Sequence, residues 1–193
     1  MTKFVLHGGG SKTWNEAEHQ ENYQTVTRVL TKGFQSPVIV LLVYFARLPE
    51  FWDEKFKEDE VNFSKEVIGL DCILEVADPD PKLFEEQVKK SDIIFVRGGN
   101  TKPLIEAIQR TLNFGQLIKD KVYFGSSAGA YLVSKYYYSN DRHQIEEGLG
   151  ILPIKCFAHW DESQQKNLDE LKNHGEVLPI TLLREGEYKV INS

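Results

Sequence analysis

The sequence Phe124-Gly125-Ser126-Ser127-Ala128-Gly129-Ala130 contains the pattern Gly-x-Ser-x-Gly, with Ser127 at its centre. This pattern is typical of a sharp turn between a strand and a helix, where the serine backbone is strained and side chains two positions away would collide. Glycine at both flanking positions removes the collision. At average residue frequencies, roughly 0.06 chance matches are expected in a chain of this length. We therefore expect Ser127, and not Ser126, to be a nucleophile.

The residues around this turn favour the same interpretation. Residues 121–124 read as a short buried strand, and residues 128–135 read as the start of a helix. A loop of glycine and serine that only reverses the chain would not need a strand before it and a helix after it.

Apolar runs and helical periodicity alternate along the rest of the chain. Strands are predicted at residues 4–6, 38–46, 70–76, 92–96, 121–124, 151–157, 177–183 and 188–192. Helices are predicted at residues 14–32, 51–68, from 81, 103–109, 128–135 and 162–174. This alternation predicts an α/β fold, a doubly wound and mostly parallel sheet with helices on both faces. No linker or repeat is present, so we expect one domain over residues 1–193.

Three glycine- or serine-containing segments follow predicted strands. They are residues 7–10 (His-Gly-Gly-Gly), residues 97–101 (Arg-Gly-Gly-Asn-Thr) and Ser127. In open parallel sheets the active site lies beyond the carboxyl ends of the strands. We therefore expect these three segments to converge.

The composition excludes several classes of protein. The net charge is −6 at pH 7 and no basic block is present, so neither a nucleic-acid partner nor an acidic membrane surface is expected. No apolar run reaches the ~18 residues of a membrane span, and the N-terminus lacks a signal-peptide layout. The two cysteines, Cys72 and Cys156, form no disulfide framework and suit a reducing compartment. The expected location is the cytoplasm.

A serine nucleophile needs a base and an acid that orients the base. His159 follows a predicted strand and precedes a predicted helix, so it is the first candidate for the base, with His7 second. Asp141, Asp161 and Glu185 are the candidate carboxylates, and the pattern alone does not separate them.

The oxyanion formed on attack needs backbone N–H donors. The N–H of Ala128 immediately follows the nucleophile, and Gly98-Gly99 can bring bare backbone close to a substrate. Residues 7–10 look like a lipase oxyanion loop or a phosphate cradle, but they lack the usual phosphate-binding spacings, and only 66 residues follow Ser127. An α/β-hydrolase is therefore not expected, and we interpret residues 7–10 as a glycine-lined edge of the pocket.

Taken together, these motifs resemble a known family. The segments 97–101 and 125–130, a histidine about thirty residues later and Leu183-Arg184-Glu185-Gly186 are similar to the serine peptidases that include aspartyl dipeptidase (peptidase E) and cyanophycinase. The resemblance implies a class I glutamine amidotransferase-like fold, a three-layer sandwich of the flavodoxin-like kind. Amidotransferases carry cysteine at the nucleophile position, so Ser127 makes glutamine-dependent ammonia transfer unexpected.

The resemblance implies a role for each matching position. Ser127 would be the nucleophile, His159 the base and Glu185 the acid, with Asp141 as the alternative acid. The oxyanion donors would be Gly99 and Ala128. The candidate pocket residues are Gly9, Gly98, Asn100 and Trp160.

The chain departs from the aspartyl dipeptidases at one point. These enzymes hold the acidic side chain of the substrate with an arginine after the histidine, and residues 160–182 contain none. Lys166 and Lys172 lack the bidentate fork of arginine, so a preference for N-terminal aspartate is not expected.

The expected function is hydrolysis of dipeptides or short peptides without a metal or cofactor. Two alternative functions remain open: an esterase or amidase that acts on a non-peptide acyl compound, and a non-catalytic binding module. The sequence also leaves open whether the protein forms a homodimer.

Overall fold

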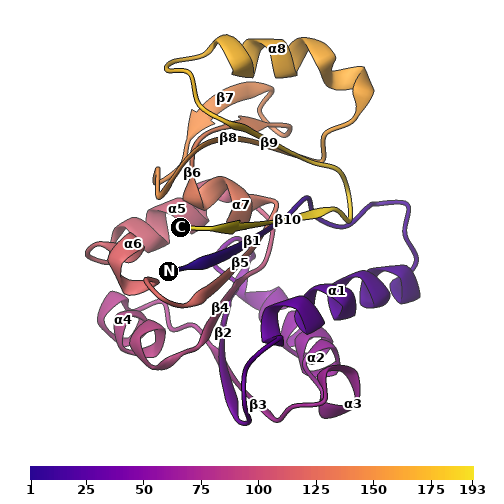
Figure 1. The fold of residues 1–193 in the computed structure, drawn as a ribbon, viewed down its shortest axis with the longest axis vertical. Helices are drawn as coiled ribbons and strands as arrows, with labels where there is room; N and C mark the ends of the chain where they lie inside the picture. Colours follow the sequence, from indigo (N-terminus) through magenta and orange to yellow (C-terminus); the bar gives the residue numbers. More distant parts are fainter.

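The computed structural model describes all of residues 1–193 and contains two sheets (Figure 1). The larger sheet has the strand order β10 (Tyr188–Asn192), β1 (Lys3–His7), β5 (Val122–Ser126), β4 (Ile93–Val96), β2 (Val38–Val43) and β3 (Cys72–Val76). Its strands are parallel except β10, which pairs antiparallel with β1. The predicted doubly wound, mostly parallel sheet is therefore confirmed.

Both faces of this sheet are covered because its central strands are apolar at every position. In β2, Val38, Val40 and Leu42 face one buried cluster, whereas Leu41 and Val43 face the other. The first cluster lies under α1 (Glu16–Thr31), α2 (Trp52–Asn62) and α3 (Lys65–Ile68). The second lies under α4 (Pro81–Lys90), α5 (Thr101–Gln109), α6 (Phe114–Leu117) and α7 (Ala128–Val133).

The smaller sheet has the order β7 (Gln144–Glu147), β6 (Ser134–Ser139), β8 (Leu152–Ala158) and β9 (Ile180–Leu183). One of its faces joins the second cluster through residues such as Ile154 and Cys156. Its other face packs under α8 (Gln165–Asn173), which lies at the top of Figure 1. The smaller sheet thus adds a further layer above α5 and α7.

Two predictions about elements are wrong. The helix predicted at residues 128–135 ends at Val133, and residues 134–139 form β6. The helix predicted at residues 51–68 is divided into a 3-10 turn, Pro49–Phe51, followed by α2 and α3. A further 3-10 turn, Glu162–Gln164, precedes α8.

Neighbouring strands of the larger sheet end at the same level. His7 pairs with Ser126, Val96 pairs with Gly125, and Val43 pairs with Val96. The loops that follow β1, β2, β4 and β5 therefore meet at one edge. In the smaller sheet Ala158 pairs with Leu183, so the segments after β8 and β9 also lie together.

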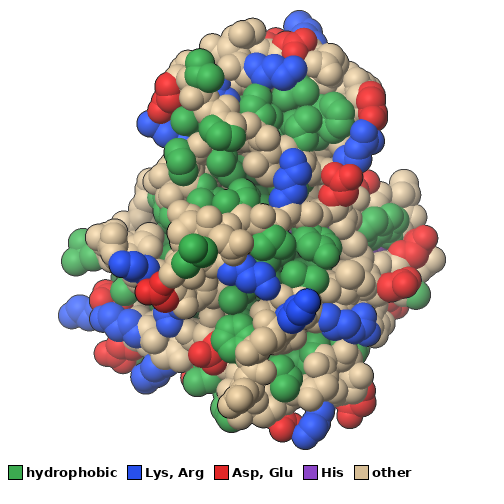
Figure 2. All heavy atoms as spheres, viewed as in Figure 1, with side chains coloured by type: hydrophobic (Ala, Val, Ile, Leu, Met, Phe, Trp, Pro, Cys, Tyr) green, Lys and Arg blue, Asp and Glu red, His purple; other side chains and the backbone are tan.

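The helices are all too short or too polar to cross a bilayer. On the face seen in Figure 2, acidic and basic side chains are interspersed.

Candidate active site

Ser127 lies at the turn between β5 and α7, where the backbone reverses direction sharply. Its φ of 48° and ψ of −101° lie outside the common regions for a side-chain-bearing residue. The turn is tight because a Cβ on Gly125 would lie 2.4 Å from the carbonyl oxygen of Gly129. The N–H of Ser127 donates to His7 O at 2.8 Å, which anchors the turn to the end of β1.

His159 comes directly after β8, and its imidazole lies next to the side chain of Ser127. Its Nε2 lies 3.0 Å from Ser127 Oγ, a distance at which the serine hydroxyl donates to the imidazole. The ring also touches the glycine loop after β1, since a Cβ on Gly9 would lie 2.4 Å from His159 Cε1. Gly9 therefore borders the imidazole, and no side chain fits there.

Glu185 lies in the turn between β9 and β10, on the far side of the imidazole. Its Oε1 lies 3.4 Å from His159 Nδ1, a long hydrogen bond between half-exposed groups. Catalytic hydrogen bonds are often long in structures without substrate and shorten when substrate binds.

The other two candidate carboxylates do not contact His159. Asp141 is exposed in the turn between β6 and β7 and makes no hydrogen bond or ion pair to the imidazole. Asp161 instead accepts the N–H of Ser163 at 2.7 Å and caps the short turn before α8.

Two backbone N–H groups near Ser127, those of Gly99 and Ala128, have no hydrogen-bond acceptor within the chain. Ala128 is the first residue of α7, so its N–H has no carbonyl one turn earlier to pair with. Gly99 lies in the loop between β4 and α5, and its N–H makes no hydrogen bond within the chain. A Cβ on Gly98 would lie 3.3 Å from Ser127 Cβ, which places this loop directly against the serine.

The remaining candidate pocket residues have other contacts. Asn100 caps α5, because its Oδ1 accepts the N–H of Lys102 at 3.1 Å. Trp160 packs against the cluster between the smaller sheet and α8, and the guanidinium of Arg184 lies 5.0 Å from the centre of its ring.

His7, the second candidate for the base, does not contact Ser127 Oγ. Its Nδ1 accepts the N–H of Gly9 at 3.0 Å, so its Nε2 carries the proton and donates to Asn22 Oδ1 at 2.8 Å. Burial lowers the pKa of His7 to about 4, which keeps the ring neutral near pH 7. Asn22 Nδ2 in turn donates to Gly186 O at 3.0 Å, so His7 and Asn22 connect the Gly9 loop to the turn that carries Glu185.

A buried ion pair lies beneath the same edge of the sheet. Arg97 Nη2 lies 2.5 Å from Asp59 Oδ1, and Tyr44 donates to Asp59 Oδ2 at 2.7 Å. The guanidinium also stacks on Tyr23, at 4.1 Å from the ring centre. Asp59 is fully buried on α2, and nothing in the polar pattern of that helix distinguishes it from its exposed neighbours.

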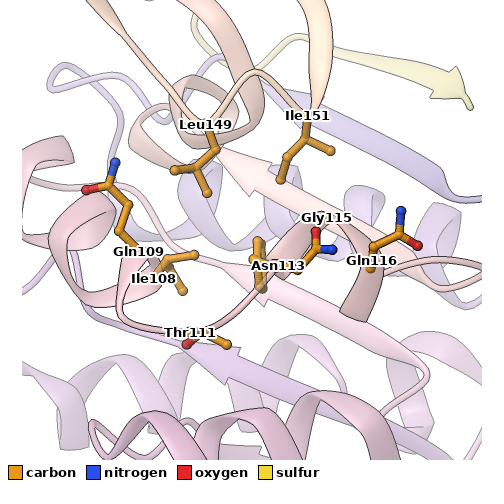
Figure 3. A pocket seen from close by; sticks show the side chains of 9 residues that line it. Ile108, Gln109, Thr111, Asn113, Gly115, Gln116, Leu149 and Ile151 are labelled. Atoms are coloured by element: carbon orange, nitrogen blue, oxygen red, sulfur yellow. The ribbon is translucent and has the colours of Figure 1, made fainter.

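Figure 3 shows a surface pocket of about 470 Å³ that lies away from these residues. It lies between the C-terminal end of α5, α6 and the segment that joins β7 to β8, where Leu149 and Ile151 point toward Ile108. None of the candidate site residues lines it.

Comparisons with known proteins identify a matching family and similar solved structures. The family model described as Peptidase family S51 matches residues 5–192. A crystal structure of a candidate peptidase E protein from Listeria monocytogenes EGD-e superposes with a TM-score of 0.64 at 19% identity, covering 99% of this chain and 97% of that one. A peptidase from an acI-B1 Actinobacterium superposes with a TM-score of 0.59 at 20% identity, covering 100% and 88%. No curated protein matches the sequence.

Proposed function

The chain belongs to peptidase family S51 and is a serine peptidase, and we propose that it hydrolyses dipeptides or short peptides through Ser127, His159 and Glu185. The observation that carries the proposal is the 3.0 Å distance between Ser127 Oγ and His159 Nε2. Two further features support the proposal. Ser127 occupies a strained turn, and the unpaired N–H groups of Gly99 and Ala128 lie near it.

In the proposed first step, Ser127 Oγ attacks the carbonyl carbon of the scissile peptide bond. His159 Nε2 accepts the hydroxyl proton, while Glu185 accepts a hydrogen bond from Nδ1–H and so fixes the tautomer. The carbonyl oxygen becomes an oxyanion, and the N–H groups of Gly99 and Ala128 stabilise it.

The tetrahedral intermediate then collapses. The C–N bond breaks, His159 returns its proton to the leaving amine, and an acyl-enzyme ester remains on Ser127. A water molecule then attacks the carbonyl carbon of the ester while His159 Nε2 accepts one of its protons, and a second tetrahedral intermediate forms. When this intermediate collapses, the bond between the carbon and Ser127 Oγ breaks and His159 returns the proton to Oγ. The product acid leaves and loses its remaining proton to solvent as a carboxylate.

The test is a dipeptide library read out by mass spectrometry, together with a fluorophosphonate probe and the variant Ser127→Ala. We expect cleavage of a subset of the library, a covalent adduct on the wild type, and loss of both in the variant, with turnover reduced by at least about 10³-fold. Hydrolysis that survives in Ser127→Ala would refute the mechanism. If the probe labels Ser127 but the protein cleaves only esters or simple amides, an esterase or amidase is favoured. If the folded wild type is not labelled at all, a binding module is favoured.

The proposed compartment is the cytosol. Cys72 and Cys156 are both free thiols, and Cys156 is fully buried, which suits a reducing environment.

A further inference from the structure

We propose that Arg47 is a positioning residue for the oxyanion hole, because its guanidinium holds the Gly98–Gly99 peptide with the N–H of Gly99 directed at the substrate. The inference rests on the proposed function, since it concerns the stabilisation of an oxyanion formed at Ser127. Arg47 itself does not touch the reacting atoms.

Arg47 lies in a tight turn that follows β2. Its N–H donates to Tyr44 O at 2.7 Å, and its own carbonyl accepts the indole N–H of Trp52 at 3.2 Å. The backbone of Arg47 is therefore anchored on both sides. Its side chain extends from this turn to the loop after β4, where Nε donates to Gly98 O at 2.6 Å.

The hydrogen bond to Gly98 O determines where the next N–H points. The carbonyl of Gly98 and the N–H of Gly99 belong to one planar trans peptide, so they are directed to opposite sides. With the carbonyl held by Arg47, the N–H of Gly99 faces away from the guanidinium. The adjacent Gly98 lies against Ser127, as the 3.3 Å approach of a Cβ to the serine Cβ demonstrates.

The loop is also held on the other side of this peptide. The N–H of Asn100 donates to Ala46 O at 2.8 Å. The segment Ala46-Arg47 thus bonds the carbonyl before Gly99 and the N–H after it, while the N–H of Gly99 stays unpaired. A donor left free between two fixed neighbours is the arrangement that preorganised oxyanion stabilisation needs.

A glycine pair requires such a restraint because its backbone rotates easily. Gly99 has a φ of 153°, and a Cβ there would lie 2.3 Å from Ala46 O, so no other residue fits. Rotation of the Gly98–Gly99 peptide would present a carbonyl oxygen to the oxyanion in place of the N–H. A charge-assisted hydrogen bond on Gly98 O opposes this rotation and also polarises the N–H that donates to the oxyanion.

Arg47 has no other interaction that explains its position. No carboxylate lies within 4.0 Å of its guanidinium, so no ion pair accounts for the position of the side chain. The Arg47 side chain makes a single hydrogen bond within the protein, the one to Gly98 O.

The test compares Arg47→Met, which keeps the length but removes the donor and charge, with Arg47→Lys, which keeps the charge. Arg110→Met is the matched control, because Arg110 is an exposed arginine whose side chain makes no hydrogen bond. For each protein we measure kcat, KM, the melting temperature and the rate at which a fluorophosphonate modifies Ser127. In that reaction Oγ bonds phosphorus, fluoride leaves, His159 takes the proton, and the phosphoryl oxygen occupies the oxyanion site.

We expect Arg47→Met to lower kcat and the labelling rate together by about 10- to 100-fold, with KM unchanged. Arg47→Lys should retain part of both rates, and Arg110→Met should match the wild type. If Arg47→Met does not fold, Arg47→Lys carries the test, with a smaller but parallel loss in both rates.

Wild-type rates in both Arg47 variants would overturn the inference. A raised KM with unchanged kcat and labelling would also overturn it, because Arg47 would then bind substrate directly. A wild type that neither cleaves peptides nor reacts with the probe refutes the proposed function itself, a result distinct from either of these.

Discussion

Ser127 and His159 both have a positive φ, which is uncommon for residues with a side chain. Their φ values are 48° and 54°, and a side-chain-bearing residue in such a region costs about 1–3 kcal/mol. The surrounding contacts hold both residues there: His7 O binds the N–H of Ser127, and the Gly9 loop abuts the ring of His159. Strained positions concentrate at functional sites, so their meeting at 3.0 Å supports the proposed pair.

The role of Glu185 can be separated from that of Asp141 by matched amide substitutions. Glu185→Gln removes the charge that steadies the imidazolium and permits the wrong tautomer, so kcat should fall by about 10²-fold or more. Asp141→Asn should leave kcat close to the wild-type value, because Asp141 makes no bond to His159. The measurement is kcat on one cleaved dipeptide for both variants. The opposite ranking would assign the acid to Asp141 and contradict the proposed triad.

The sequence predicts some site residues and not others, for a physical reason. Ser127 carries its own local signature, because its glycine neighbours and flanking strand and helix are adjacent in the chain. Arg47 and Asn22 have none, since Arg47 bonds a residue 51 positions away and Asn22 bonds one 164 positions away. Only the folded chain brings these partners together.

Among the elements, the buried parallel strands are predictable and β6 is not. Strands β2 and β4 are apolar at every position because helices cover both of their faces. In contrast, α7 has only 6 residues and passes directly into β6. The hydroxyl of Ser134 donates to Ala130 O at 2.7 Å and closes the last turn of the helix. Three tyrosines at residues 136–138 are typical of a strand, and this signal could have identified β6.

The turn between β5 and α7 should not tolerate a side chain at residue 125. Gly125→Ala places a methyl group 2.4 Å from the carbonyl oxygen of Gly129, and the resulting backbone shift should lower the free energy of unfolding by about 1–3 kcal/mol. The matched control is Gly115→Ala in α6, where the nearest atom lies 3.5 Å away. Urea unfolding of both variants measures the difference. If the two substitutions change the free energy of unfolding equally, the turn at residue 125 is not under steric constraint.

At the scale of the whole molecule, the proposed catalytic residues are divided between the two sheets. Ser127 and the two proposed oxyanion donors, Gly99 and Ala128, lie at the edge of the larger sheet, whereas His159 and Glu185 follow strands of the smaller one. The fold class was predictable from the alternation of strands and helices. The alignment of the two sheets was not, because it depends on the packing of a cluster that both sheets share.

Tyr131 is the residue through which we test this alignment. It lies on α7, immediately after the serine turn, and its hydroxyl donates to Ala158 O at 3.2 Å and accepts the N–H of Ala158 at 3.1 Å. Its ring stacks on Tyr137 of β6 with centroids 4.4 Å apart. Tyr131 therefore connects the helix that follows Ser127 to the strand end that carries His159.

Tyr131→Phe should lower kcat by more than the accompanying loss of unfolding free energy would explain. It leaves the N–H of Ala158 without its acceptor, which costs about 1–3 kcal/mol of unfolding free energy. A small displacement of His159 from Ser127 should lower kcat by about 10- to 100-fold, because proton transfer requires close alignment. The control is Tyr138→Phe in β6, a buried tyrosine whose hydroxyl makes no hydrogen bond within the chain. Both are assayed at a temperature where both are fully folded, and equal kcat values would show that His159 is aligned without Tyr131.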